Sequence, residues 1–461
     1  MNEYVVEPAR RIPVAQADVV VVGGGTAGCI AAVAAARAGA KTYLIEKNPI
    51  VGGTYTNGGT GTFSFFSTNA VPEKAHRIVD GIPYEMINRI DALGGFTGFI
   101  PTPNESHHCP YRAMSDHEAY IAAVSDMLLE AKVEVLLQTM LSRVVTEDGV
   151  IKAIIVENKD GRSAIEANAF VDCTGDGDLA RYAGCEQIEH WQDYTQVCSA
   201  PTAMVFGMGG IDFEKVVREN PEAAVAKRYP DGRIFCLSFY HTKSPRYKQI
   251  SQMDVRHYIN FHTLHENEAT YINCFTGPII NGSSAVAASK AELELRIRNY
   301  QLAKAFRECV PGFENSYMNW NARQIGVRNS RITLCDKSLT EQEIEDATRF
   351  DDEIGLSGFH DLRARKPECT IREPGYYGFP YRMLVARDCK NLYMAGRCVT
   401  EDIEAHMATR NTVGCMVMGQ GAGVSAALCA KKNCMARELP YSELRSELLR
   451  QNVCLEVNDK A

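Results

Sequence analysis

One stretch near the start of the chain, residues 17–46, restricts the fold more than any other. It contains four consecutive valines, a glycine-rich turn, an alanine-rich segment and a second apolar run that ends at Glu46. This order is typical of a strand–helix–strand crossover in a buried parallel sheet. The glycines stand at the spacing G-x-G-x-x-G, at Gly23, Gly25 and Gly28. The stretch therefore predicts an α/β fold of the Rossmann type that binds a dinucleotide.

Each glycine of this turn has a physical task. Gly23 permits the tight turn out of the strand, Gly25 lets backbone amides approach a pyrophosphate, and Gly28 lets the helix pack close to the sheet. Free N–H groups and the dipole at the helix N-terminus stabilise the phosphate charge. Glu46, at the end of the second strand, is placed to bond the ribose hydroxyls. A glycine-rich turn in another kind of α/β protein is the alternative interpretation.

Composition limits the class of protein. With 461 residues, of which 45% are hydrophobic, the chain can form two or three lobes. Its net charge of −8 argues against a general nucleic-acid binder. No segment approaches the roughly 20 apolar residues of a membrane span, and the N-terminus has no secretory signal pattern. The 16 cysteines show no C-x-x-C spacing, so we expect reduced, mostly buried thiols in a cytoplasmic protein without a structural metal.

Turn signals divide the chain into three parts. Asp-Gly pairs at 148–149 and 160–161 predict an antiparallel β-meander at about 140–168, inside a first FAD-binding part at 1–185. Residues 186–374 are predicted to form a substrate or cap lobe of α+β character, and 375–461 the closing part of the FAD-binding domain. Within these parts we expect a helix at 114–131 with Ser115 as its N-cap, a strand at 133–139, a helix near 290–308 and a closing helix from about 414.

The organisation of the chain favours FAD over NAD. The meander and the second lobe are inserted before the sheet is completed near residues 391–396, whereas an NAD domain is usually contiguous. No second G-x-G-x-x-G follows a strand, so a separate nicotinamide site is not expected. A flavin without a built-in nicotinamide domain must exchange electrons with a substrate and with a diffusible acceptor or donor.

Several segments together carry a resemblance to a known family. They are residues 20–46, 52–53, 171–178, 326–331, 391–397 and 415–423. Through them the chain resembles the FAD-dependent oxidoreductases of the glutathione-reductase-type fold. More narrowly, it resembles the bacterial FAD-dependent oxidoreductase family that is distantly related to fumarate reductase flavoproteins. One departure is Arg397, because related flavoproteins often place an acid there to bond the ribityl chain.

The resemblance implies a set of FAD contacts spread along the chain. Those implied for the pyrophosphate are Gly23, Gly24, Gly25, Thr26, Ala27 and Gly28, with Thr174, Gly175 and Asp176 returning to it. Those implied for the rest of the cofactor are Glu46 and Lys47 at the adenosine ribose, Gly52, Gly53 and Thr54 along the FAD, Gly396 and Arg397 at the ribityl chain, and Thr412, Val413 and Cys415 at the flavin. The last three would begin a helix whose dipole stabilises the anionic pyrimidine edge of reduced flavin.

The catalytic candidates are one histidine and three arginines. His406 could take a proton near neutral pH, and Arg410, one helical turn later, could hold a carboxylate or an oxyanion. The alternatives are a structural bond from His406 to a carbonyl and an ion pair of Arg410 with Glu401, Asp402 or Glu404. Arg328 and Arg331 are placed by the resemblance near the junction of the lobes, or else they pair with the acidic run 341–353.

Two further motifs have plain structural alternatives. His107-His108-Cys109 suggests a metal site, but adjacent ligands diverge in regular structure and no nearby carboxylate completes a set, so no metal is predicted. Tyr55, Asn57 and Phe63 could cover a face of the flavin, although packing explains them equally well.

The sequence therefore favours one function over three others. We expect a flavoenzyme that transfers a hydride between flavin N5 and a small polar substrate, hydroxylated or carboxylated, in the direction of dehydrogenation. The alternatives are reduction of an activated C=C bond in the manner of fumarate reductase, flavin-dependent modification of RNA or another macromolecule, and a plain nicotinamide dehydrogenase. No nucleic-acid partner is expected, and association of the chain with its own copies is left open.

Overall fold

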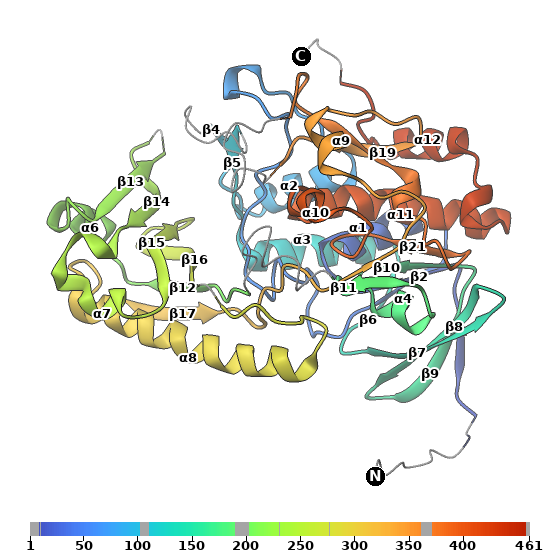
Figure 1. Cartoon of the computed structure of the whole chain (residues 1–461), viewed down its shortest axis with the longest axis horizontal. Coiled ribbons are helices and arrows are strands. Elements are labelled where there is room, and N and C mark those ends of the chain that lie inside the picture. Colours follow the sequence, from blue (N-terminus) through green and yellow to red (C-terminus); the bar gives the residue numbers. More distant parts are fainter. Residues whose placement is uncertain are drawn as a thin grey trace.

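Two bodies with separate hydrophobic cores make up the molecule (Figure 1). The computed structural model describes residue 9 and residues 11–101, 110–189, 202–229, 231–275, 277–360 and 371–457. The larger core draws on residues 19–185 and 335–455, and the smaller core on residues 204–325. The boundaries at 186 and 374 stay a prediction. The hydrophobic packing divides the chain more narrowly, because buried residues between 335 and 356 join the larger core.

A five-stranded parallel sheet forms the centre of the larger body. Its strand order is β21-β10-β2-β3-β6, and every neighbouring pair is parallel. These strands are β2 (Val19–Val22), β3 (Thr42–Ile45), β6 (Glu134–Leu136), β10 (Ala169–Asp172) and β21 (Leu392–Met394). The sheet confirms the predicted α/β fold, including the strand near residue 134 and the late return of the chain at β21. All four valines of β2 are buried, as a strand covered on both faces requires.

Two helices pack closely against each other on one face of this sheet. They are α1 (Thr26–Arg37) and α11 (Thr412–Lys432), which both contact strands β2 and β10 (Figure 1). A Cβ atom at Gly419 would overlap the backbone of Ala27, and one at Gly423 would overlap the backbone of Ala31. Small residues therefore let the two helices touch backbone to backbone, with Gly419, about two turns into α11, beside the start of α1.

Helix α11 corrects the expectation that no segment approaches a membrane span. It is long and apolar enough to cross a membrane by length and composition, with a mean hydropathy of 1.5. However, 94% of that apolar window is buried inside the protein. A central helix covered on all sides is apolar all round for the same reason as a membrane helix.

The predicted meander is present as β7 (Met140–Glu147), β8 (Val150–Asn158) and β9 (Gly161–Glu166). The sequence did not reveal its fourth strand, β1 (Val14–Gln16), which pairs with β9 in parallel. The predicted helix at 114–131 is α3 (His117–Glu130), but its N-cap is Asp116 rather than Ser115. The Asp116 carboxylate accepts bonds from the Glu118 and Ala119 amides, whereas the Ser115 hydroxyl contacts the hydroxyl of Tyr55.

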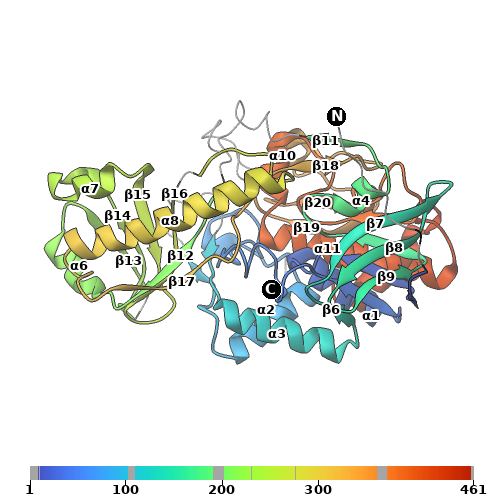
Figure 2. The same ribbon diagram turned by 90° about the horizontal axis from the view of Figure 1, so that it is seen from below.

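The smaller body is a six-stranded sheet with one long helix. The neighbouring strands are all antiparallel, in the order β13-β14-β15-β16-β12-β17. They are β12 (Phe206–Gly209), β13 (Ala224–Arg228), β14 (Ile234–Phe239), β15 (Val255–His262), β16 (Glu268–Phe275) and β17 (Tyr317–Asn321). Helix α8 (Ala285–Cys309), the predicted helix near 290–308, lies along one face of this sheet (Figure 2). The shorter helices α6 (Phe213–Glu219) and α7 (Lys248–Ser251) close its outer end (Figure 1).

Short elements connect and cover the two bodies. In the larger body they are α2 (Ile82–Ala92), β4 (Ile100–Pro101), β5 (Tyr111–Arg112), α4 (Asp178–Tyr182), α9 (Glu341–Glu345), β19 (Glu353–Ser357), β20 (Tyr377–Pro380), α10 (Ile403–Thr409) and α12 (Tyr441–Arg450). A two-stranded ladder of β11 (Gln187–Glu189) and β18 (Arg331–Thr333) marks both ends of the excursion into the smaller body. Most cysteines in the described part of the chain are buried, as predicted, and none of those described forms a disulfide.

Candidate functional site

The three glycines of the first turn differ in what surrounds them. Gly23 has φ of +99°, and a Cβ there would overlap the carbonyl group of Cys173. A Cβ at Gly28 would overlap the carbonyl oxygen of Gly23, so the helix packs on the strand end with no room for a side chain. At Gly25, by contrast, a Cβ would have only the Cα of Gly53 within reach, at 3.8 Å. Neither φ nor packing therefore requires glycine at this position.

The open space at Gly25 is the feature that fits a bound pyrophosphate. Gly25 is the N-cap of α1 and its backbone is extended, without a side-chain cap on the first helical amides. Uncapped amides at a helix start, with free space in front of them, form an anion site. The residues present therefore fit the FAD that the sequence predicts, with Thr26 and Ala27 as the first helical residues behind the loop.

A second loop lies against this turn. Gly52 forms a parallel bridge with Gly25, and its amide donates to the Gly24 carbonyl at 2.7 Å. The neighbouring Gly53 comes so close that a Cβ would lie 2.7 Å from the Gly25 Cα. The next residue, Thr54, is exposed. The predicted cofactor loops 23–28 and 52–54 are thus adjacent in space.

Glu46 is buried beside the same turn. Its carboxylate accepts the Gly24 amide at 2.6 Å and both the amide and the side-chain nitrogen of Asn48 at 2.8 Å. These bonds hold the acid at the end of β3, where its remaining lone pairs are available to ribose hydroxyls. Lys47 is exposed next to it.

The return of the chain after β10 brings three predicted residues together. Asp176 forms an ion pair with Arg397 at 2.8 Å, and Ser330 donates to Asp176 and accepts from Arg397. Gly175, with φ of +77°, lies against the Arg397 guanidinium. Burial raises the pKa of the Asp176 carboxyl, but Arg397, Ser330 and Lys47 outweigh it and hold this pKa below its ordinary value.

Arg397 therefore has a definite task in place of the acid that the resemblance suggested. It neutralises Asp176 in a half-buried pair and so fixes the loop 174–176 beside Gly396. The Thr174 amide and hydroxyl bond the Asp172 carboxylate, at 3.0 and 2.7 Å. Ser330, the bridge between Asp176 and Arg397, was missed by the sequence analysis as a site residue, although it lies in the segment 326–331 that carries the resemblance.

The start of α11 lies next to these residues. A Cβ at Gly396 would have the Ala27 Cβ at 3.4 Å and the Cys415 Sγ at 3.8 Å as its nearest neighbours. The Asn411 side chain caps the helix by accepting the Gly414 amide at 2.9 Å. This bond leaves the amides of Thr412 and Val413 at the helix start, where they can face an anionic flavin edge. Burial raises the pKa of Cys415 to about 12, so this residue is a neutral thiol.

His406 does not face an open site. The side chain is fully buried on α10, its Nδ1 lies 2.8 Å from the Glu401 carboxylate, and its Nε2 lies 3.2 Å from the Arg328 carbonyl oxygen. Glu401 also accepts a bond from the Thr409 hydroxyl. A carbonyl oxygen only accepts hydrogen bonds, so Nε2 carries a hydrogen and donates it there. The arrangement thus favours the structural alternative for His406 and gives no support to its role as a proton acceptor.

Arg410 has a different environment from His406, although both were predicted to share a helix face. Helix α10 ends at Thr409, and Arg410 is its half-buried C-cap. Its guanidinium contacts the Met407 sulfur at 3.4 Å, and its Nε is buried without a partner. Among the described residues no carboxylate pairs with Arg410, which removes the ion pairs considered as its alternative. Its charge also acts on the nearby Cys415 thiol.

The other two candidate arginines, Arg328 and Arg331, have different surroundings, because only Arg331 belongs to a strand. Arg331 is buried on β18 and pairs with Asp178, the first residue of α4, rather than with the acidic run 341–353. Arg328 precedes that strand, is half-buried, and offers its carbonyl to His406. In the same segment the side-chain nitrogen Nδ2 of Asn329 is buried without a hydrogen-bond partner.

The aromatic residues after Gly53 pack in the core. Tyr55 and Phe63 are stacked at 4.3 Å between ring centroids, and both contact Tyr120 of α3. Of the two interpretations of Tyr55 and Phe63, this burial favours packing in the core. Asn57 differs from them, because its buried Nδ2 has no partner while its backbone carbonyl accepts the amides of residues 323 and 324. The segment His107-His108-Cys109 lies outside the described residues.

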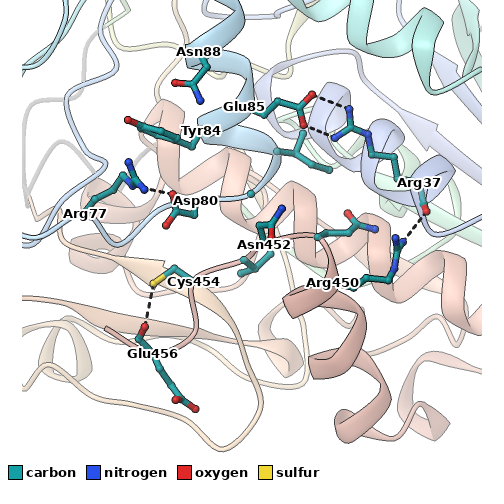
Figure 3. A pocket seen from close by; sticks show the side chains of 14 residues that line it. Arg37, Arg77, Asp80, Tyr84, Glu85, Asn88, Arg450, Asn452, Cys454 and Glu456 are labelled. Atoms are coloured by element: carbon teal, nitrogen blue, oxygen red, sulfur yellow. Dashed lines mark hydrogen bonds and ion pairs between the residues drawn. The ribbon is translucent and has the colours of Figure 1, made fainter. Parts of the chain in front are cut away.

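A groove of about 850 Å³ lies elsewhere, at the C-terminal end of α1 (Figure 3). Its charged side chains already have partners: Arg37 pairs with Glu85 at 2.9 Å and Arg77 with Asp80 at 2.8 Å, while Arg450 and Glu456 pair with residues outside the groove. None of the predicted site residues lines it. Because its charges are already neutralised, this groove is not the candidate site.

Comparisons with known proteins bear on this site. A tRNA uridine 5-carboxymethylaminomethyl modification enzyme MnmG from Clostridium botulinum is 24% identical over 305 residues, which cover 58% of this chain and 42% of that protein. A digeranylgeranylglycerophospholipid reductase 2 from Methanothermobacter thermautotrophicus is 26% identical over 170 residues, covering 37% of this chain and 42% of that protein. The chain thus spans less than half the length of these curated relatives. The crystal structure of a geranylgeranyl bacteriochlorophyll reductase-like protein from Thermoplasma acidophilum aligns with 96% of this chain and 85% of that chain, at 14% identity and a TM-score of 0.44.

A family model extends the comparison to almost the whole chain. The model described as FAD dependent oxidoreductase matches residues 18–448, which include both bodies and every predicted cofactor segment. The match confirms the predicted family, the FAD cofactor and the enzyme class, while the role of each site residue stays a prediction. The chain belongs to the family of FAD dependent oxidoreductases.

Proposed function

We propose that the protein dehydrogenates a small polar substrate, hydroxylated or carboxylated. A hydride passes from a substrate carbon to flavin N5, and the hydroxyl proton is released to solvent. The electrons then leave to a diffusible acceptor, since only one dinucleotide-binding motif is present in the sequence. We place this reaction in the cytoplasm, without a nucleic-acid partner.

The observation that carries the proposal is that the Arg410 side chain is half-buried and has no carboxylate partner among the described residues. A half-buried guanidinium without a carboxylate partner among the described residues is costly unless a ligand completes it. Arg410 lies beside the start of α11, where the flavin edge is predicted. Its planar fork suits an oxygen that becomes more negative as a C–OH group is converted to a carbonyl. The buried, unpartnered donors of Asn57 and Asn329 add hydrogen-bonding capacity for the cofactor or the substrate.

The direct test is anaerobic reduction of the enzyme-bound flavin. FAD-loaded protein is mixed with hydroxy acids, sugars, sugar acids and polyols, and the loss of the visible absorbance of oxidised flavin is followed. We expect at least one hydroxylated compound to bleach the flavin, and an added acceptor to restore the colour. Failure of the whole panel, with reoxidation of reduced enzyme by an unsaturated acid instead, would assign the reverse chemistry, reduction of a C=C bond.

Arg410→Gln tests the residue itself. We expect kcat/KM to fall by about 10²-fold with FAD content unchanged, because a charge-assisted contact to the reacting oxygen is lost. Arg410→Lys should recover part of this loss, since the charge returns without the fork. Arg181→Gln, which removes an exposed arginine of α4, is the matched control. Equal activity of the Arg410→Gln and Arg181→Gln variants contradicts the assignment.

RNA modification is the second candidate function, favoured by the similarity to the tRNA-modifying enzyme named above. The net charge of −8 opposes it, because RNA binding draws on a basic surface. A gel-shift titration with tRNA at low salt separates the two candidates: retarded tRNA supports modification, and unshifted tRNA supports the small-molecule reaction.

A further inference from the structure

One row of side chains crosses the sheet of the smaller body and has no task in the site described so far. Lys227 on β13 is in register with Cys236 on β14, Cys236 with His262 on β15, and His262 with Tyr271 on β16. Residues directly opposite each other on neighbouring strands share one face of a sheet. These four side chains therefore form a continuous row on one face.

The row lies on the face opposite to helix α8. Successive strand residues alternate between the two faces, and the neighbours Leu237 and Phe261 belong to the core beneath α8. Phe261 contacts Phe306 of that helix, with 5.0 Å between ring centroids. His262, the next residue, is thereby directed away from α8.

That face meets the larger body. Trp320 on β17 lies edge-on to His117 at the start of α3, with ring centroids 5.0 Å apart. His265, three residues beyond β15, lies 3.3 Å from the Asp116 carboxylate, which caps α3. Arg112 of β5 also approaches from the larger body, and its charge acts on both Cys236 and His262. The row is thus part of the interface region between the two bodies.

The two charged side chains that act on His262 are both cations, and the Asp116 carboxylate of this region contacts His265 instead. In the described part of the molecule neither Arg112 nor Lys227 forms an ion pair, and the ring nitrogens of His262 have no hydrogen-bond partner. His262 is only 7% exposed and its ring contacts Tyr271. Burial, and then the charges of Arg112 and Lys227, lower the pKa of His262 to about 3, so the ring is neutral and can donate one hydrogen bond.

We propose that Arg112, Lys227 and His262 form a subsite for an oxyanion of the substrate, separate from the oxygen held by Arg410. Half-buried Arg112, exposed Lys227 and the buried ring of His262, none of them paired with a carboxylate among the described residues, match the oxygens of a carboxylate or a phosphate group. The inference rests on the proposed function and narrows it. The substrates are hydroxylated compounds that also carry an oxyanion, such as hydroxy acids, sugar acids or phosphorylated polyols, in preference to neutral polyols.

Calorimetric titration of the FAD-loaded enzyme tests the subsite without turnover. The probes are malonate and inorganic phosphate, each in a buffer free of other oxyanions, which separates carboxylate from phosphate as the preferred source. We expect one binding site for at least one probe, weakened at least tenfold in Arg112→Gln and several-fold in His262→Gln. Arg246→Gln removes an exposed arginine of η3 (Pro245–Tyr247) in the same lobe, and this variant should bind the probes like the natural sequence.

Two results would overturn the subsite. One is the absence of binding of both probes, and the other is equal weakening by Arg112→Gln and Arg246→Gln, which indicates a general charge effect. The fate of the proposed function is read separately. If Arg112→Gln no longer binds the probes but no compound reduces the flavin of the natural enzyme, the subsite is supported and the proposed dehydrogenation is contradicted. If neutral polyols reduce the flavin with the same KM as the corresponding acids, the dehydrogenation is supported and the oxyanion subsite is contradicted.

Discussion

The nucleotide-binding turn and the region between the two bodies recognise ligands by opposite means. At the turn, Gly25 leaves space in front of backbone amides, and Gly52 pairs with it through the backbone, within one compact part of the larger body. Between the bodies, Arg112 and His262 offer charged and polar side chains from strands far apart in the sequence. A cofactor shared by many enzymes is met by backbone geometry, whereas a substrate specific to one enzyme is met by side chains on a variable lobe.

The largest expected effect comes from filling the space at Gly25. In Gly25→Val the new side chain finds room in the protein but occupies the place of the pyrophosphate. We therefore expect loss of FAD from the purified protein, with a Kd at least 10²-fold higher for added FAD, while the apoprotein keeps its melting temperature. Flavin released on heating and the melting curve of the apoprotein measure the two properties.

Gly28→Val is the matched control, because it makes the same substitution three positions later. There the side chain would overlap the Gly23 carbonyl, so we expect the folding of the crossover itself to fail, with little soluble protein. The two variants separate a glycine needed by the ligand from a glycine needed by the fold. Normal flavin content in Gly25→Val would break the contrast between the two regions.

The same contrast explains how much the sequence could predict. The valines of β2, the glycine spacing and the two Asp-Gly turns act through local geometry, so the crossover, the sheet and the meander were predictable from short segments. Lys227 and His262 lie on different strands, and only the strand register makes them neighbours. Their types and spacing carry no local signal, so this row could not be found before the fold was known.

The environment of Arg410 and His406 shows a second limit. Their spacing of one helical turn predicts a shared face, but α10 ends between them, at Thr409. Helix ends are set by capping and tertiary contacts, which a spacing rule does not include. One side chain consequently enters the core and the other remains beside the predicted flavin.

A smaller effect is expected from His406→Ala. His406 is tied to Glu401 and to the Arg328 carbonyl, so it joins α10 to the segment that carries Asn329. Removing the ring leaves the Glu401 carboxylate buried without its main partner. We expect the free energy of unfolding to fall by about 3–5 kcal/mol, as measured by urea denaturation, with FAD still bound.

The double variant His406→Ala/Glu401→Gln separates this structural role from a catalytic one. Removing the charge together with the ring should restore much of the lost stability, and turnover should return with it. If His406→Ala instead unfolds like the natural sequence but loses kcat, His406 acts in the reaction. In that case a side chain of the larger body takes part in the reaction, and the larger body no longer contacts its ligands through the backbone alone.

The smallest effect concerns Asp172, the acidic side chain on which the backbone turn after β10 depends. Its carboxylate accepts bonds from Thr174 and from the Ala180 amide, yet burial raises its pKa to about 6. Between about pH 4 and pH 6 the folded protein therefore holds a proton that the unfolded chain has released. The free energy of unfolding should fall as the pH rises through this range, by about 2–3 kcal/mol in all.

Asp172→Asn cannot titrate and should lose this dependence of stability on pH, whereas Asp160→Asn, in an exposed turn of the meander, should retain it. An unchanged slope in Asp172→Asn would mean that the acid is ionised throughout, and that its hydrogen bonds with Thr174 and Ala180 outweigh its burial.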